Sequence, residues 1–141
     1  MKKEIGVYID RTYKVVRQDL INRFKKAGID ITPEQWVLLS KLERTTMNQT
    51  DLANGSFKDK HTVSRILDLL VKKGFVVREQ DPEDGRKYLV SLTPLGTEEL
   101  EKAKPHVYTS RELGWENLSD EEYQQLLKLL DKVFNNYSSK S

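Results

Sequence analysis

Cysteine is absent from the 141 residues of this chain. Its absence excludes disulfide bonds, thiolate metal sites and a thiol redox sensor, and it is typical of a cytoplasmic protein. No apolar run approaches the ~20 residues that a transmembrane helix requires. The amino-terminal segment MKKEIGVYID also lacks the apolar stretch of a secretory signal. We therefore expect a cytoplasmic protein that has no membrane partner.

Patterns of catalytic residues are missing as well. The sequence contains no nucleophile and base at a motif spacing, no glycine-rich phosphate loop and no metalloenzyme motif. Its 2 histidines, His61 and His106, fall in different predicted elements, so they do not form a cluster of metal ligands. These absences argue against an enzyme, a metal site and a cofactor.

The chain also lacks a strong net charge, because 24 basic residues are balanced by 22 acidic ones and the formal net charge is only +2. The charges are nevertheless unevenly distributed. Eight bases and three acids lie between residues 2 and 26, whereas eight acids and three bases lie between residues 94 and 123. The pattern fits either two solvated helix faces or a molecule with a functional positive side, and both interpretations stay open.

Two helices are predicted in the first third of the chain. Apolar residues at spacings of three and four predict a long helix over residues 4–27, and Gly28 is a typical residue just beyond a helix end. Thr32 is a good cap for a second helix, with Gln35 at the position that completes a capping box. This second helix is expected to extend to about Glu43.

A short helix and a longer one follow. Asn48 can cap the short helix, and Gly55 and Ser56 are expected to end it early. Asp59 can cap the longer helix, which runs to about Lys73, where Lys72 and Lys73 complement the helix dipole. The buried face of the longer helix is expected to hold Val63, Ile66, Leu67 and Leu70, and the opposite face His61, Arg65, Asp68 and Lys72.

A charged β-hairpin is predicted directly behind this longer helix. Residues 75–80 and 87–93 are rich in β-branched and aromatic side chains, and they enclose the turn-forming stretch DPEDGR. A short helix, a turn, a second helix and a hairpin make up a winged helix-turn-helix, here at about residues 31–93. We therefore expect a mainly α fold with a small β-hairpin wing, organised as one domain over residues 1–141.

Two further helices are predicted after the hairpin. Thr93 begins the first of them, which should kink or break near Pro105 because a proline nitrogen has no hydrogen to donate. Ser119 begins the second, with Glu122 at the position that completes a capping box. The tail SSKS at the end of the chain is expected to fray.

This arrangement suits double-stranded DNA. The polar start of the helix after Asp59 can lie in a major groove, and the hairpin tip can reach a minor groove or the phosphate backbone. The acids of the tip, Asp81, Glu83 and Asp84, would repel phosphates unless they are directed elsewhere. The candidate DNA-binding residues are Lys60, His61, Thr62, Ser64 and Arg65 on the helix, and Arg86 and Lys87 on the hairpin.

The stretch DKHTVSRILDLLVKKGFVVREQDPEDGRKYLVSLTPLG, together with TPEQWVLLSKL and NQTDLA, resembles the MarR family of bacterial regulators over nearly the whole chain. The residues Asp84, Gly85 and Arg86 match the Asp-x-Arg pattern in the wing of that family. The resemblance implies that Arg86 enters a minor groove and that Asp84 holds the wing and its basic side chains in place. Gly55 and Ser56 depart from the family, whose members continue the third helix with longer residues. Three residues are still expected to face the core there: Leu52, Ala53 and Phe57.

The resemblance also implies a homodimer that pairs through helices at about residues 4–27 and 94–137. The sequence supports this independently, because the apolar stripes in 4–27 and 120–137 exceed what one small winged-helix core needs. A two-fold dimer would place its recognition helices about 34 Å apart, on the two halves of a pseudo-palindromic operator. The alternative is that these helices wrap their own chain.

We interpret the chain as a sequence-specific DNA-binding transcriptional regulator, a repressor that a small molecule releases. The resemblance implies a small aromatic or phenolic effector between the dimer helices and the winged domain, with Tyr8, Tyr13 and Trp36 as candidate contacts. Aromatic residues at helical spacing are more often plain core. The rival interpretation is a winged-helix protein-interaction module that does not bind DNA.

Overall fold

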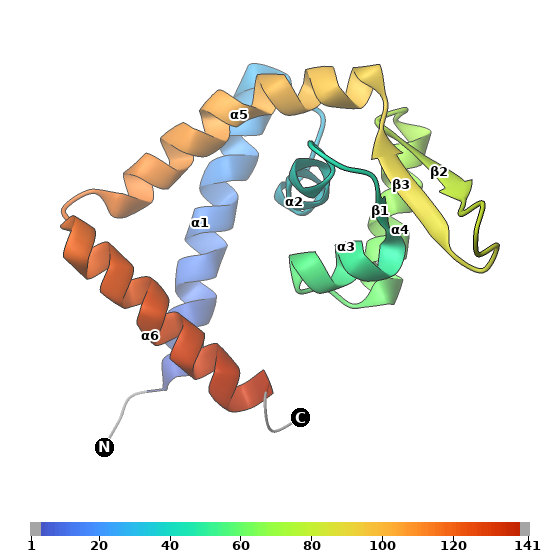
Figure 1. Ribbon diagram of the computed structural model, residues 1–141. Coiled ribbons are helices and arrows are strands. Elements are labelled where there is room, and N and C mark those ends of the chain that lie inside the picture. The colour runs from blue at the N-terminus through green and yellow to red at the C-terminus, as the bar shows by residue number, and fades with distance from the viewer. Residues whose placement is uncertain (1–3, 139–141) are drawn as a thin grey trace. The chain divides into compact units, whose positions relative to one another are not determined.

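The computed structural model describes residues 4–138, so Lys2, Lys3 and the last three residues of the SSKS tail lie outside the described part of the chain. The chain divides into two compact units, the first of which ends at Ser110 and the second of which begins at Arg111. None of the helices in the described part combines the length and hydrophobicity that a membrane span requires. The elements are α1 (Ile5–Ala27), α2 (Pro33–Lys41), β1 (Met47–Asn48), α3 (Gln49–Ser56), α4 (Lys60–Lys72), β2 (Val76–Gln80), β3 (Tyr88–Leu92), α5 (Pro94–Trp115) and α6 (Asp120–Ser138) (Figure 1).

The predicted wing is part of a three-stranded antiparallel sheet with the strand order β1-β3-β2. Strands β2 and β3 are the predicted hairpin, with Val76 opposite Leu92. Strand β1 lies on the other side of β3 and pairs Met47 with Val90. The sequence did not predict β1, because a strand of 2 residues is too short to show an alternating pattern. In Figure 1 the sheet lies beside α3 and α4, and the β2–β3 loop extends away from the helices.

Predicted helix ends are confirmed by local geometry. Gly28 adopts the left-handed conformation with φ +70° just beyond α1. Thr32 Oγ1 accepts a hydrogen bond from the Gln35 N–H at 3.1 Å, and Gln35 Oε1 accepts one from the Thr32 N–H at 3.1 Å, which completes the capping box of α2. Side-chain caps also begin α3, α4, α5 and α6, at Asn48, Asp59, Thr93 and Ser119.

The core lies in the first unit and confirms the predicted buried faces of α2 and α4. Among its fully buried side chains are Leu38, Leu39, Leu52, Val63, Leu67, Leu70, Val90 and Leu100. Phe57 was expected to face this core, and that prediction is wrong, because its exposed fraction is 81%. Phe57 has a φ of +58° and ends α3 in the left-handed conformation. A residue in this conformation no longer continues the buried face of the helix before it.

The start of α5 is packed closely against the turn between α4 and β2. The Thr93 hydroxyl donates to the Gly74 carbonyl at 2.5 Å, and the Thr93 N–H donates to the Phe75 carbonyl at 3.1 Å. A Cβ atom at Gly96 would stand 2.0 Å from the Phe75 carbonyl oxygen, so only glycine fits there. These contacts fix the direction in which α5 leaves the sheet.

The sequence predicted a kink or a break near Pro105. Helix α5 runs without a break through Pro105 to Trp115, so the break is wrong, and the kink stays a prediction. A proline at this position leaves the Glu101 carbonyl without its usual helical donor. Both Pro105 and Glu101 are exposed, so water can bind that carbonyl and the helix can continue.

Helix α6 differs from α4 in burial, because none of its residues is buried in this chain. Three of its leucines, Leu126, Leu127 and Leu130, have exposed fractions of 46%, 41% and 40%. The amino-terminal half of α1 is similar, since Ile5 and Ile9 are exposed, although Phe24 near its end is buried in the core.

Candidate DNA interface

Helix α4 presents along one side the polar residues that the sequence singled out. Lys60, His61 and Arg65 are exposed, whereas Thr62 and Ser64 are half-buried. The other side of the helix is completely covered by the core, through Val63, Leu67 and Leu70. The helix is therefore fixed from behind, and its amino-terminal half is accessible to a large ligand.

Thr62 has a structural role in addition to its place in the candidate interface. Asp59 Oδ1 accepts the Thr62 N–H at 2.7 Å, and Asp59 Oδ2 accepts the Thr62 hydroxyl at 3.0 Å. These two hydrogen bonds hold the pKa of Asp59 below its ordinary value, and the bond from the Thr62 backbone has the larger effect. Because the hydroxyl hydrogen is donated to Asp59, it is not available to a phosphate while the cap is intact. Thr62 is thus the least suited of the five helix candidates to bind a phosphate.

The tip of the wing carries Arg86 and Lys87, and both are exposed. The Arg86 side chain has an exposed fraction of 93%. Asp84 Oδ1 accepts the Arg86 backbone N–H at 3.1 Å and lies 3.4 Å from Arg86 Nε. Asp81 Oδ1 accepts the Glu83 N–H at 2.9 Å. Two of the three acids in the tip therefore bind backbone groups of the turn, which gives them a use other than contact with DNA.

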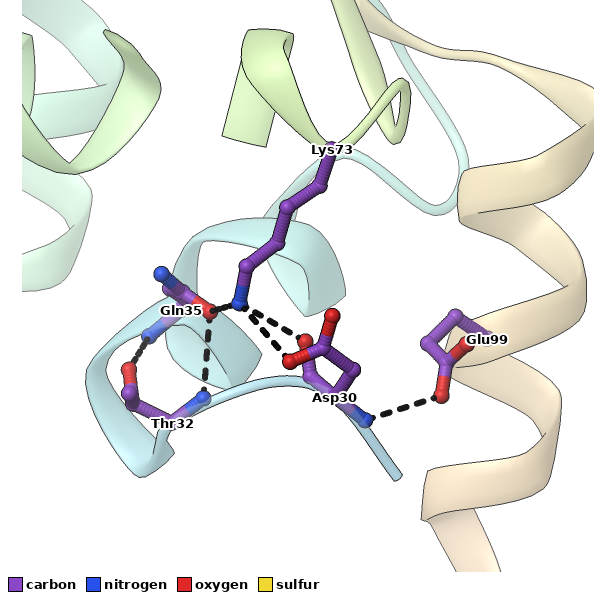
Figure 2. Close-up of polar contacts among 5 residues, drawn as sticks. All are labelled: Asp30, Thr32, Gln35, Lys73 and Glu99. Atoms are coloured by element: carbon purple, nitrogen blue, oxygen red, sulfur yellow. Dashed lines mark hydrogen bonds and ion pairs between the residues drawn. The ribbon is translucent and has the colours of Figure 1, made fainter. Parts of the chain in front are cut away.

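Lys73, the residue that follows α4, forms a polar junction at the end of this helix (Figure 2). Its Nζ donates to the Asp30 carbonyl at 2.8 Å and to Gln35 Oε1 at 3.1 Å, and it lies 3.3 Å from the Asp30 carboxylate. The Asp30 N–H donates to Glu99 Oε1 at 3.3 Å. We call Asp30, Thr32, Gln35, Lys73 and Glu99 the Lys73 junction. It joins the end of α4 to the α1–α2 connection, the capping box of α2 and the first half of α5.

The sequence predicted only a helix-dipole role for Lys73, so the junction was missed. Its partners Asp30 and Gln35 are 43 and 38 residues away along the chain. No local spacing pattern indicates a contact over such a distance. The one available signal was the capping box itself, because Gln35 had to lie at the start of α2.

The three aromatic candidates for ligand contact have different environments. Trp36 has an exposed fraction of 6% and is part of the core. Tyr8 and Tyr13 are exposed on α1, and the Arg11 guanidinium lies 4.3 Å from the centre of the Tyr8 ring. Core packing accounts for Trp36 without a ligand, whereas the two tyrosines are accessible.

The chemistry of these residues is that of a binding surface. Within residues 4–138, no three histidine, aspartate or glutamate side chains gather closely enough to hold a metal ion. The exposed candidates on α4 and at the wing tip, Lys60, His61, Arg65, Arg86 and Lys87, are instead cations and hydrogen-bond donors, and phosphates and base edges accept hydrogen bonds from such groups.

Comparison with known proteins agrees with this geometry. A model of the MarR family matches residues 31–88. The HTH-type transcriptional repressor YetL of Bacillus subtilis is 34% identical over 72% of this chain and 61% of its own length, so the match spans less than two thirds of that relative. The uncharacterized HTH-type transcriptional regulator YkoM of the same organism is 31% identical over 87% of this chain and 79% of its own length.

Solved structures share the fold over nearly the whole chain. A mutant MarR from E. coli, complexed with operator DNA, is 28% identical, covers 92% of each chain and has a TM-score of 0.83. Bordetella bronchiseptica BpsR, whose DNA binding is regulated by 6-hydroxynicotinic acid, has a TM-score of 0.86 over 94% of each chain, and at 23% identity it shows the fold alone. The exposed recognition helix, the wing and these likenesses together show that the chain belongs to the MarR family of DNA-binding winged helix-turn-helix transcriptional regulators, which are not enzymes.

Proposed function

We propose that this protein is a homodimeric repressor that binds a pseudo-palindromic operator and leaves it when a small molecule binds. The observation that carries the proposal is the joint exposure of two basic elements, the amino-terminal half of α4 and the tip of the wing. Repression is supported by the relative YetL, a repressor, and by the likeness to MarR in complex with operator DNA. A protein that binds the chromosome of a bacterium is expected in the cytoplasm.

In this proposal α4 lies in a major groove, where Lys60, His61 and Arg65 contact base edges and phosphates. Ser64 and Thr62 contribute less, because both are half-buried. At the wing tip, Arg86 enters the minor groove and Lys87 contacts the phosphate backbone of the DNA.

Asp84 has a distinct role in the proposal, which is to restrain Arg86. It accepts the backbone N–H of Arg86 and lies close to its Nε. A side chain that is held near its bound conformation loses less conformational entropy when it binds. Asp84 therefore favours DNA binding even though its own charge repels phosphates.

The dimer is supported by apolar surface that the single chain leaves in water. Ile5 and Ile9 on α1, and Leu126 and Leu130 on α6, have exposed fractions of 40% or more. Exposed apolar surface of this extent marks an interaction site. We assign it to a second copy of the chain, which would fix the separation of the two recognition helices.

Release by an effector is the remaining part of the proposal. DNA binding by BpsR is regulated by 6-hydroxynicotinic acid, so an aromatic acid regulates one protein of this fold. For this chain we infer a small aromatic or phenolic effector that contacts Tyr13, and Trp36 only if the core opens beside it. The effector would favour a separation of the recognition helices that does not match successive grooves of the operator.

Selection of genomic DNA fragments by the purified protein tests the proposal and yields the operator. The expected fragments share an inverted repeat whose half-sites are centred about 10 base pairs apart. Arg86→Ala should then bind the operator about tenfold more weakly and reduce the slope of log affinity against log salt by about 1. Lys102→Ala on α5 is the matched control and should leave both values unchanged. Selection of fragments without a shared repeat contradicts the proposal.

Asp84→Asn distinguishes restraint from simple electrostatics in the same titration. Loss of a negative charge near phosphates predicts tighter binding, whereas loss of the restraint on Arg86 predicts weaker binding. We expect binding to weaken about threefold to fivefold. Tighter binding would mean that Asp84 does not position the wing.

A further inference from the structure

Arg78 lies on the sheet face that is turned toward the helices. It is the third residue of β2, two positions after Val76, which is buried, while the intervening Val77 is exposed. Alternate residues of a strand share a face, so Arg78 and Val76 point to the same side. A guanidinium that the helices largely cover needs acceptors for its charge and its N–H groups. The acceptors that Arg78 binds therefore indicate its role.

Two acceptors from two different helices bind the Arg78 guanidinium. Its Nη2 donates to Asp68 Oδ1 on α4, and its Nη1 lies 3.5 Å from Gln49 Oε1, on the first residue of α3. The Arg78 side chain has an exposed fraction of 24% and the Asp68 side chain one of 56%. A single planar group thus joins the wing strand to both helices of the helix-turn-helix.

Asp68 belongs to the face of α4 that carries the proposed DNA contacts. It follows Arg65 by three residues and His61 by seven, which are the spacings of neighbours on one helix face. All three residues are exposed. The Arg78–Asp68 pair therefore ties the wing to the side of the recognition helix that faces the ligand, rather than to its buried side.

Stability alone does not account for this arrangement. Partly exposed ion pairs contribute little to the free energy of unfolding. A guanidinium, in contrast to an ammonium, holds two acceptors in a fixed plane and so defines the geometry between the elements that carry them. What the pair can determine is the angle between the wing and α4.

We propose that Arg78 is a positioning residue for DNA recognition, one that fixes the wing relative to α4 through Asp68 and Gln49. It lets Arg86 reach the minor groove when Arg65 is in the major groove. The inference rests on the proposed function, because it needs both elements to contact the same operator half-site. Arg78 is assigned no DNA contact in this account, because its Nη1 and Nη2 bind Gln49 and Asp68.

For Asp68→Asn we expect a change in operator affinity opposite to the one that electrostatics alone predicts. Asp68 places a negative charge beside the proposed phosphate contacts, so removal of that charge should tighten binding if only electrostatics matters. If Asp68 holds Arg78, and through it the wing, then Asp68→Asn should weaken binding instead. We expect Asp68→Asn and Arg78→Gln each to weaken operator binding by about tenfold, and the double variant to be no weaker than either single variant.

Footprinting on the selected operator tests the inference directly. Hydroxyl-radical protection of the flanking minor grooves reports the wing, and protection of guanine N7 from methylation reports α4 in the major groove. In Arg78→Gln and Asp68→Asn the flanking protection should be lost at protein concentrations that retain the major-groove protection. Arg78→Lys should recover little of it, because an ammonium cannot hold two acceptors in one plane. Glu79→Gln is the matched control, since Glu79 lies on the opposite face of β2 and is exposed.

The outcomes separate the inference from the proposed function. If the wild-type protein gives no flanking protection, the proposed wing contact fails, whatever Arg78 does. If the wild type protects both grooves and both variants do so equally, Arg78 has no positioning role. Equal loss in both grooves, or tighter binding by Asp68→Asn, also overturns the inference. Thermal unfolding of each variant identifies any loss of fold. Asp68→Asn weakens the same contact from a more exposed side, because it removes the charge of the acceptor, so the test does not depend on Arg78→Gln alone.

Discussion

Helices α4 and α6 have the same kind of apolar pattern, but the apolar face of α4 is buried and that of α6 is exposed. In α4 the residues Val63, Leu67 and Leu70 are completely buried by the chain's own core. In α6, apolar residues recur at the same spacings, yet Leu126 and Leu130 keep exposed fractions of 46% and 40%. The periodicity of a sequence predicts that a face will be covered, but it does not predict which molecule covers it.

The structure adds that distinction, and it locates the helix whose apolar residues the chain itself does not cover. The first unit contains a complete core, formed by α2, α3, α4 and the sheet with the end of α1 and the first half of α5. The second unit, from Arg111 onward, contains no buried residue in its described part. We therefore assign DNA reading to the first unit, and to the second the pairing that brings two reading units onto one operator.

The largest expected effect is that of deleting residues 120–141. The first unit keeps its core and all proposed DNA contacts, so it should still fold. Without the surface of α6, two copies no longer bind an operator together, and the gain from bivalent binding is lost, on the order of a thousandfold in affinity. Gel-shift titration of the operator measures this loss.

Leu130→Asp is the point-variant control for that deletion. A carboxylate at the proposed interface would have to be buried without a partner, so it should weaken operator binding in the same direction. Lys128→Asp, a change of charge at a position that already carries a charged side chain, should have a much smaller effect. Full operator affinity of the truncated protein would show that α6 is dispensable for DNA binding.

The next largest effect is a loss of stability, which should depend on protein concentration for a variant in α6 but not for one in α4. Leu67→Ala should lower the free energy of unfolding by about 3 kcal/mol, because Leu67 is completely buried in the core. Leu130→Ala should act mainly through assembly, so its loss of stability should shrink as the protein concentration rises. Thermal unfolding across a hundredfold range of concentration measures both. An equal dependence on concentration for the two variants would break the distinction between α4 and α6.

A smaller effect is expected at the Lys73 junction, which belongs to the first unit. Lys73→Met removes the donor for the Asp30 carbonyl and for Gln35 Oε1, and it should cost about 1–2 kcal/mol of stability. Lys72→Met, at the exposed neighbouring position, is the matched control and should change stability by less than about 0.5 kcal/mol. Chemical denaturation measures the difference, and equal effects of the two variants would show that the junction contributes nothing.

The smallest effect concerns where α1 joins the core. Arg17 Nη2 lies 2.6 Å from Glu34 Oε1 at the start of α2, and this hydrogen bond holds the pKa of Glu34 below its ordinary value of 4.5. A lowered pKa in the folded state adds stability above the unfolded-state pKa, and this stability is lost as the pH falls through the folded-state value. Glu34→Gln should therefore cost about 1 kcal/mol or less at pH 7, and the difference should disappear as the pH falls below 4.5. Unfolding curves between pH 7 and pH 3 measure it, and a difference that does not change with pH contradicts the assignment.

Local chemistry is the part of the fold that the sequence predicted best. The capping box of Thr32 and Gln35, the cap at Asp59 and the left-handed Gly28 all depend on residues within a few positions of one another. The buried face of α4 follows from periodicity within the helix. Family resemblance then supplied the wing pattern that ends in Arg86, which periodicity could not.

The errors arise where tertiary structure overrides a local rule. Phe57 is apolar but follows the end of α3 in the left-handed conformation, so it does not continue the buried face. Pro105 lies where solvent reaches the helix, so the missing hydrogen bond does not break α5. Local patterns could not predict the contacts of Lys73 and Arg78, because their partners lie between 10 and 43 residues away and on other elements. The individual DNA contacts remain predictions.

Sedimentation equilibrium of the intact protein, alone and with the selected operator duplex, tests most directly the claim that two copies read one operator. The chain has a mass of 16.4 kDa. The account predicts a species of twice that mass at micromolar concentration, and two chains on each duplex. A stable single chain in solution together with one chain per duplex would contradict it.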